Sequence, residues 1–184
     1  VIRRMSVNML RVHLRRMGEQ LGRNLDARLA DILANGDGVN PETAPVTINT
    51  MTAGQWRYDD LLHGFTTLTL GHYFTPTHLL ANAETLCGLL AMDNLRDALL
   101  FDFAKTGNLP TPLGVKLVPM ADQPAGKLTI LDAGYAAQKL TEQDLLVESD
   151  KLIHQQWDRT YLTVVTDFAI IYAKARIVLN SDWN

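Results

Sequence analysis

Residues 1–38 read VIRRMSVNMLRVHLRRMGEQLGRNLDARLADILANGDG. Apolar residues recur in this stretch at steps of three and four, which is the period of one face of an α-helix. Asn35 and the glycines at positions 36 and 38 are typical of a helix C-terminus, because glycine readily adopts the left-handed conformation that ends a helix. The pattern therefore predicts one helix over residues 1–34. Its apolar stripe consists of Val7, Leu10, Leu14, Met17, Leu21, Leu25, Leu29 and Ile32.

The predicted helix is long for the size of the chain. At 1.5 Å per residue it measures about 50 Å, whereas a compact protein of 184 residues spans only about 40 Å. Gly18 and Gly22 lower the helix propensity by about 1 kcal/mol each, which is tolerable if another segment packs closely there. We therefore expect an elongated subunit that buries part of this helix against neighbouring copies, and assembly is the first functional hypothesis.

The same segment is basic. Residues 1–38 hold seven arginines and four acidic residues, a local charge of +3, so the remaining residues carry −6 to reach the net charge of −3. A basic segment on an acidic body can pair with the body of the next copy, although single surface charges usually contribute little. Arginines with interspersed acids and no neighbouring aromatic residues are a weak signal for nucleic-acid binding.

The composition is that of an ordinary folded globular chain. Hydrophobic residues make up 47% and charged residues 20%, which suits one domain or two interleaved lobes. Cys87 is the only cysteine, which excludes an internal disulfide and a cysteine-pair zinc site, and its apolar neighbours predict a buried thiol. No apolar run reaches 18 residues and no signal-peptide pattern is recognisable, so we expect no membrane partner.

Shorter elements are expected along the middle of the chain. Periodicity predicts helices at 57–70, at 83–92 with Asn82 as its N-cap, and at 95–103. The segment 73–81 contains Pro76 and is expected to be extended. Alternation and β-branched residues predict short strands at 46–49, 115–118, 128–131 and 145–148.

The chain closes on its strongest β signal, residues 160–179. Two apolar runs flank Thr166 and Asp167, which are expected to turn the chain into a hairpin. In the second run, alternate residues from Ala169 to Leu179 form a wholly apolar face, whereas Lys174 and Arg176 lie on the other face. We expect the apolar face to cover the long first helix, because no other predicted element approaches the helix in length.

The sequence contains no recognisable catalytic or metal-binding motif. His63, His72 and His78 cluster in sequence near Asp59 and Asp60, but their spacing matches no helical pair of ligands and no known metal signature. The glycines at 36 and 38 follow a helix rather than a strand, so they do not form a nucleotide-binding turn. We therefore expect no catalytic, cofactor-binding or metal-binding residue, and no enzyme. A small hydrolase that uses the three histidines is a remote alternative.

The order of these elements resembles the major capsid proteins of tailed bacteriophages, which have the Hong Kong 97-type fold. The resemblance rests on the long helix that ends at 35–38, the mixed middle region with its extended segment 73–82, and the closing β segment that ends at 173–179. It implies an α+β fold with two lobes. The peripheral lobe would comprise residues 1–49 and 160–184, with the helix packed on a long hairpin, and the axial lobe residues 50–159.

The resemblance also implies a function. The chain would self-assemble through pentamers and hexamers into an icosahedral shell that encloses phage DNA, with the DNA held by weak non-specific contacts. Its partners would be other copies of itself, and scaffolding, protease or decoration proteins are further candidates. It would reside in the virion after assembly in the host bacterial cytoplasm. Leu10, Leu14, Leu21 and Leu25 would form the buried face of the helix, and intersubunit or lumen-facing contacts would fall to Arg4, Arg11, Arg15, Arg16 and Arg23.

The sequence departs from the family at its start. Family members carry an N-terminal arm and a long loop before this helix, whereas Val1 already lies in the helical pattern, so we expect that an N-terminal part has been removed or left out. Two alternatives to a capsid remain: an encapsulin-like compartment that encloses enzymes, and a DNA-binding module of a different class that uses the basic helix.

Overall fold

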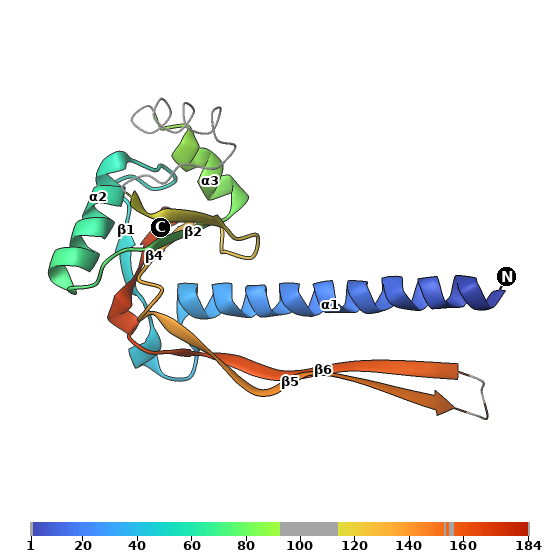
Figure 1. The fold of residues 1–184 in the computed structure, drawn as a ribbon. Helices are drawn as coiled ribbons and strands as arrows, with labels where there is room; N and C mark the ends of the chain where they lie inside the picture. The colour runs from blue at the N-terminus through green and yellow to red at the C-terminus, as the bar shows by residue number, and fades with distance from the viewer. Residues whose placement is uncertain (1, 93–113, 153, 155–156, 184) are drawn as a thin grey trace.

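The chain folds into a compact body from which one helix and one β-hairpin project (Figure 1). The computed structural model describes residues 2–92, 114–152, 154 and 157–183. The helix expected at 95–103 lies outside the described residues. The N-terminus lies at the far end of the projecting helix, whereas the C-terminus lies at the body. The protein is therefore elongated, as the length of the first helix predicts.

The first helix, α1 (Ile2–Asn35), confirms the prediction from periodicity. It ends at Gly36, whose φ of 88° is in the left-handed region and whose N–H donates to the carbonyl oxygen of Ile32 at 2.9 Å. A Cβ at position 36 would lie 3.1 Å from the carbonyl oxygen of Thr43, so glycine is required here for both conformation and space.

Asp37 holds the turn that follows α1. Its carboxylate accepts hydrogen bonds from the N–H groups of Val39 at 2.9 Å and Asn40 at 2.8 Å, and from the Thr43 hydroxyl at 2.7 Å. These bonds, that of Asn40 foremost, lower the pKa of Asp37 below its ordinary value of 3.8. The turn continues into the 3-10 helix η1 (Pro41–Thr43) and leads to the first strand.

We expect Asp37→Asn to lower stability at neutral pH and to lose this effect in acid. A carboxylate whose folded pKa is depressed stabilises the folded state above its unfolded pKa, and this stabilisation disappears as the pH falls through the folded pKa. The difference in urea midpoint between the wild type and the variant should therefore be constant above about pH 5 and shrink below pH 3.8. A difference that is independent of pH would contradict this role.

The body is built on a five-stranded sheet with the order β1-β7-β4-β2-β3. The two outer pairs are parallel and the two inner pairs are antiparallel. The strands predicted at 46–49, 115–118 and 128–131 are confirmed within one residue at each end. The strands are β1 (Val46–Asn49), β7 (Arg176–Asn180), β4 (Lys127–Leu131), β2 (His78–Ala81) and β3 (Lys116–Pro119).

Helices cover one face of this sheet. They are α2 (Tyr58–Thr66), which continues into a π-helical turn η2 (Thr67–Gly71), and α3 (Ala83–Leu90). Asn82 caps α3 as predicted, because its side chain accepts a hydrogen bond from the N–H of Thr85 at 2.7 Å. Gly64 lets α2 approach the sheet closely, since a Cβ there would lie 2.7 Å from Cδ1 of Ile130.

The core is divided between the two faces of the sheet. Leu128 and Ile130 of β4 point toward α2 and α3, whereas Leu131 points to the opposite face, where it packs with Leu33 from the end of α1. This division follows from the alternation of side chains along a strand. The body therefore holds α1 by its last turns.

The long hairpin differs from the prediction. It consists of β5 (Ala137–Leu152) and β6 (Trp157–Ile170), which pair in antiparallel register. Thr166 and Asp167 lie within β6 and do not form a turn, so the predicted hairpin position is wrong. The strand predicted at 145–148 is one part of β5, which has two register irregularities between Thr141 and Leu146.

The apolar face expected to cover α1 is also divided between two elements. A 3-10 helix, η4 (Ala173–Ala175), separates β6 from β7. Ile177 and Leu179 of β7 are fully buried in the core of the body, where they pack with α2. The strand that contacts α1 most is β6, whereas Arg176 of β7 reaches only the last turn of α1. The prediction that residues 169–179 cover the helix as one strand is therefore wrong.

Candidate assembly surfaces

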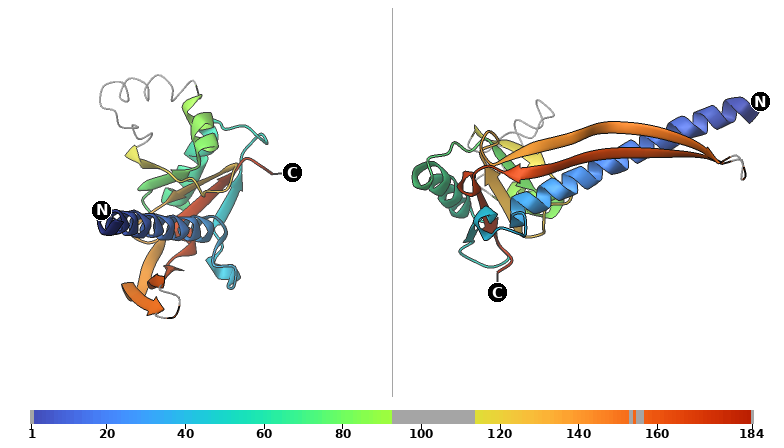
Figure 2. Two further views of the ribbon diagram at one scale, coloured as in Figure 1. Left: turned by 90° about the vertical axis from the view of Figure 1, so that its right-hand side faces the viewer. Right: turned by 90° about the horizontal axis from the view of Figure 1, so that it is seen from below.

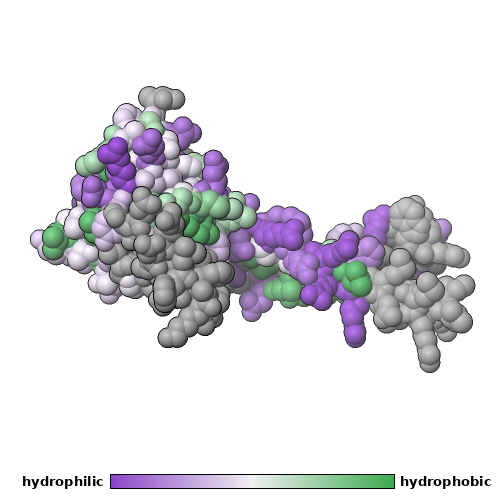
Figure 3. All heavy atoms as spheres, turned by 90° about the horizontal axis from the view of Figure 1, so that it is seen from above, coloured by the Kyte–Doolittle hydropathy of each residue, from purple (hydrophilic) through white to green (hydrophobic). Residues whose placement is uncertain are grey.

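The projecting part of the molecule, here called the arm, consists of α1 and the β5–β6 hairpin. Figures 1 and 2 show that both elements leave the body in the same direction. Arg28 joins them, because its Nε lies 3.4 Å from the Asp167 carboxylate on β6. Seen from above in Figure 3, the described part of the arm is narrower than the body and mostly hydrophilic, with isolated hydrophobic patches.

Arg176 connects the arm to the body. Its side chain is fully buried, and its Nε donates to the carbonyl oxygen of Leu33 at 3.0 Å. Its Nη2 donates to the carbonyl oxygens of Ile32, at 3.4 Å, and Thr43. The cation therefore occupies the negative end of the α1 dipole and satisfies the carbonyl of Leu33, which the helix end leaves unpaired. Burial lowers the pKa of Arg176 to about 10, so the group remains charged at neutral pH.

The sequence placed Arg176 on the face opposite to Ile177 and Leu179, and in β7 it does lie on that face, where it is fully buried against the end of α1. The sequence did not predict this burial. One signal in the sequence could have indicated it. A single arginine stands directly before three apolar residues, Ile177, Val178 and Leu179, and a cation in such surroundings can pair with the carbonyl groups at the end of a helix. Lys174, the other cation assigned to that face, is exposed.

The body covers α1 only near its C-terminal end. Among the residues of α1 whose side chains the structure describes, those that are buried begin at Ala30. Leu14, Leu21 and Leu25 are half-buried, and Leu10 lies among the residues whose side chains are not described. Met17 is 39% exposed and Val12 52%. The subunit itself therefore buries this stripe only in part. The part of α1 before Ala30, here called the outer helix, leaves apolar surface exposed.

The contacts within the subunit do not explain why α1 contains glycine at positions 18 and 22. A Cβ at Gly18 or Gly22 would meet no atom within 4 Å, so the close packing expected there is not supplied by the described part of the chain. Both residues lie on the half of the helix that the body leaves uncovered.

We expect Gly18→Ala and Gly22→Ala each to stabilise the isolated subunit by about 1 kcal/mol, because alanine has the higher helix propensity and finds free space. If a neighbouring copy approaches the helix at these positions, the same substitutions will reduce assembly. Thermal unfolding and light scattering of each variant measure the two effects. Gains in both stability and assembly would show that nothing packs closely on the glycines.

The hairpin is as exposed as the outer helix. Large apolar side chains along it are 40–54% exposed. A two-stranded ribbon is at best marginally stable alone in water, so strands of 16 and 14 residues require further contacts. The exposed apolar residues of the hairpin are Leu140, Leu145, Leu146, Val147, Tyr161 and Val165.

A group of aromatic residues lies on the body near the base of the hairpin. The ring of Phe74 lies 5.7 Å from that of Tyr135 and 5.9 Å from that of Tyr172, measured between centroids. Tyr73 beside them is 88% exposed and has a φ of 63°, a conformation that costs energy for a residue with a side chain. Exposed tyrosines of this kind are enriched in protein interfaces.

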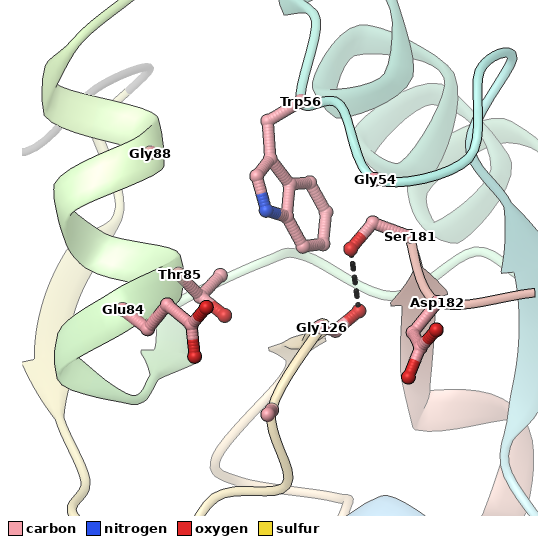
Figure 4. Close-up of a pocket in the computed structure, with 9 residues that line it drawn as sticks. Gly54, Trp56, Glu84, Thr85, Gly88, Gly126, Ser181 and Asp182 are labelled. Carbon is pink, nitrogen blue, oxygen red and sulfur yellow. Dashed lines mark hydrogen bonds between the residues drawn. The ribbon is translucent and has the colours of Figure 1, made fainter.

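One polar cavity of about 350 Å³ lies between α3 and the end of β7. Figure 4 shows Glu84 and Thr85 of α3 on one side of it, Ser181 and Asp182 on the other, and the ring of Trp56 between them. The Ser181 hydroxyl donates to the carbonyl oxygen of Gly126 at 3.1 Å. The residues that line it include two carboxylates, Glu84 and Asp182, and no histidine or cysteine.

The histidines singled out in the sequence do not form a site. His63 is in α2, His72 follows η2 and His78 begins β2. Across the described ranges, no group of three His, Cys, Asp or Glu residues could hold a metal ion. Cys87 is exposed on α3, not buried as predicted. No helix among the described residues has both the length and the apolar character needed to cross a bilayer.

The comparison with protein families decides the identity of the chain. A family model described as phage capsid protein matches residues 1–177. The chain belongs to the phage capsid protein family. No curated protein sequence matches it, so the family assignment rests on this model.

Solved structures show that this capsid protein has the Hong Kong 97-type fold. A structure from Mycobacterium phage Che8 matches with a TM-score of 0.72 and 14% identity, over 94% of this chain and 63% of that chain. The capsid of an empty GTA particle matches with a TM-score of 0.67 and 15% identity, over 91% of this chain and 64% of that one. The resemblance inferred from the order of the elements is therefore confirmed.

An encapsulin has a similar fold. The holo-SrpI encapsulin complex from Synechococcus elongatus PCC 7942 matches with a TM-score of 0.60 and 18% identity, over 94% of this chain and 65% of that chain. The capsid protein thus spans less than two thirds of the length of each of these three structures. Their likeness establishes the fold, and the family model favours a phage capsid over a compartment.

Proposed function

We propose that the chain is a subunit of an icosahedral phage shell whose copies contact one another through the arm. The observation that carries this proposal is the uncovered apolar surface of the outer α1 and the hairpin, on a protein of the phage capsid family. Many weak contacts of this kind produce a stable closed particle through multivalency, and symmetry repeats each contact around the shell.

The proposed arrangement has two lobes. The peripheral lobe contains residues 1–49 and 160–184, and the axial lobe, residues 50–159, gathers at five-fold and six-fold positions in pentamers and hexamers. Since β5 pairs with β6 along its length, we extend the peripheral lobe to include β5. Because β1 and β7 belong to the same sheet as β2, β3 and β4, we assign these two strands to the axial lobe. The arm would then lie in the wall of the shell, where neighbouring subunits cover it.

The proposed cargo is phage DNA, held by weak non-specific contacts. Arg11, Arg16 and Arg23 are exposed on α1 and form no salt bridge with another described residue. Arginines on the inner surface of a shell would neutralise phosphates without reading a sequence. The proposed location is the virion, after assembly in the host cytoplasm.

Sedimentation of the purified protein, monitored at 260 and 280 nm, tests the proposed function. The proposal predicts closed particles, with nucleic acid when they are isolated from infected cells. Particles that contain enzymes in place of nucleic acid would favour a compartment. A monomer that binds duplex DNA tightly, with an affinity that falls steeply as salt rises, would contradict the shell and favour the DNA-binding module.

A further inference from the structure

The two elements of the arm carry opposite charge. Helix α1 contains seven arginines and three acidic residues, a net charge of +4. The segment 137–170, which forms the hairpin, contains six acidic residues and three basic ones, a net charge of −3. Within one copy, Arg28 and Asp167 provide the single salt bridge between the two elements among the described residues.

Two of the arginines form a stripe that points away from the hairpin of their own copy. Arg16 and Arg23 are seven residues apart, so they lie on the same side of α1, and Val12 lies one turn before Arg16 on that side. At 100° per residue, Arg28 is displaced from Arg23 by about 140° around the helix. Arg28 reaches its own hairpin, so the stripe formed by Val12, Arg16 and Arg23 faces another direction. All three side chains are exposed.

The hairpin presents a matching acidic face. From Leu146 to Leu152 its register is regular, with Glu148 opposite Tyr161 and Asp150 opposite Arg159. Alternation and cross-strand pairing therefore place Leu146, Glu148, Asp150, Arg159 and Tyr161 on one face of the ribbon, which carries two carboxylates, one guanidinium and a net charge of −1. The two carboxylates are exposed, and Leu146 and Tyr161 beside them are 40% and 48% exposed. This face combines negative charge with apolar side chains, as the helix stripe combines positive charge with Val12.

We propose that the acidic face of the hairpin of one copy docks on the arginine stripe of α1 in a neighbouring copy. The inference rests on the proposed shell and identifies one of its interfaces. Opposite charges fix the register and exclude wrong pairings, and the apolar side chains between them supply buried area. Because every copy carries both surfaces, the contact is head-to-tail, the type that closes into rings when the rotation between copies permits.

Charge reversal tests the pairing. The helix-reversed variant carries Arg16→Glu and Arg23→Glu, and the hairpin-reversed variant carries Glu148→Lys and Asp150→Lys. At low salt each variant alone should assemble at least about tenfold less than the wild type, because its hairpin and helix surfaces then carry the same sign. A matched control, Glu42→Lys with Asp59→Lys, changes the net charge as the hairpin reversal does, on exposed residues of η1 and α2, and should assemble normally.

The decisive sample is an equimolar mixture of the two reversed variants. The hairpin of each variant is then complementary to the helix of the other, so assembly measured by light scattering should return. Near-normal assembly of both variants alone would overturn this interface and leave the shell intact. Impaired variants whose mixture stays impaired would also overturn it. A wild type that stays monomeric under the same conditions would overturn the proposed function itself, and with it this interface.

Discussion

Replacing Arg176 with methionine is expected to lower the free energy of unfolding by about 3 kcal/mol. The substitution leaves the carbonyls of Leu33 and Thr43 without their donor, whereas the carbonyl of Ile32 keeps the N–H of Gly36. Hydrogen bonds from a charged donor contribute about 1.5–3 kcal/mol each. Removal of a buried charge offsets part of this loss. Urea unfolding of the subunit, followed by circular dichroism, measures the difference.

Two further variants separate the role of the guanidinium from that of charge alone. Arg176→Lys keeps a cation but loses the planar fork that reaches several carbonyls, so its stability should lie between those of the wild type and the methionine variant. Lys174→Met removes an exposed cation two residues away and should change stability by less than about 0.5 kcal/mol. If Arg176→Met unfolded at the wild-type midpoint, Arg176 would not be the joint between arm and body.

Replacing Leu14 and Leu21 together with glutamine is expected to abolish assembly while the subunit stays folded. Both side chains are half-buried in the subunit, and glutamine is a good helix former, so the free energy of unfolding should fall by no more than about 1 kcal/mol. In an assembly that covers the outer helix, the same change places two polar groups in an apolar contact repeated in every subunit. Sedimentation and urea unfolding of the double variant measure the two effects.

Ile32→Ala is the matched control, because Ile32 belongs to the same stripe but is fully buried by the body. Its expected loss is about 2–4 kcal/mol of stability, without a direct effect on contacts between copies. If the glutamine variant destabilised the subunit as much as Ile32→Ala does, the outer helix would be covered within the subunit. If it assembled normally, no neighbour would cover Leu14 and Leu21.

The sequence predicted the elements that the body packs. The extent of α1, the cap at Asn82 and three strands of the sheet follow from periodicity and local hydrogen bonding, because their side chains meet one core. The hairpin could not be placed in the same way. β5 is exposed on both sides, so it mixes acids with leucines and lacks a sustained alternation. In β6 the polar pair Thr166 and Asp167 resembles a turn although it lies within the strand.

The outer helix shows a second reason why the sequence could not predict the whole fold. Its apolar stripe is as regular at Leu14 and Leu21 as at Ile32, yet the body buries only Ile32 completely. Periodicity reveals that a surface needs a partner but does not say whether the partner belongs to the same copy. The burial of Arg176 could not be predicted for a related reason. Its cation is bound by the carbonyls of Ile32 and Leu33, which are distant in the sequence and are brought close only by the fold.

Electron cryomicroscopy of the assembled protein tests the central claim most directly, namely that neighbouring copies cover the arm. We predict a closed shell in which the outer part of α1 lies against another subunit and Val12 and Met17 are buried there. A closed shell in which Val12 and Met17 face solvent on every copy would contradict this account.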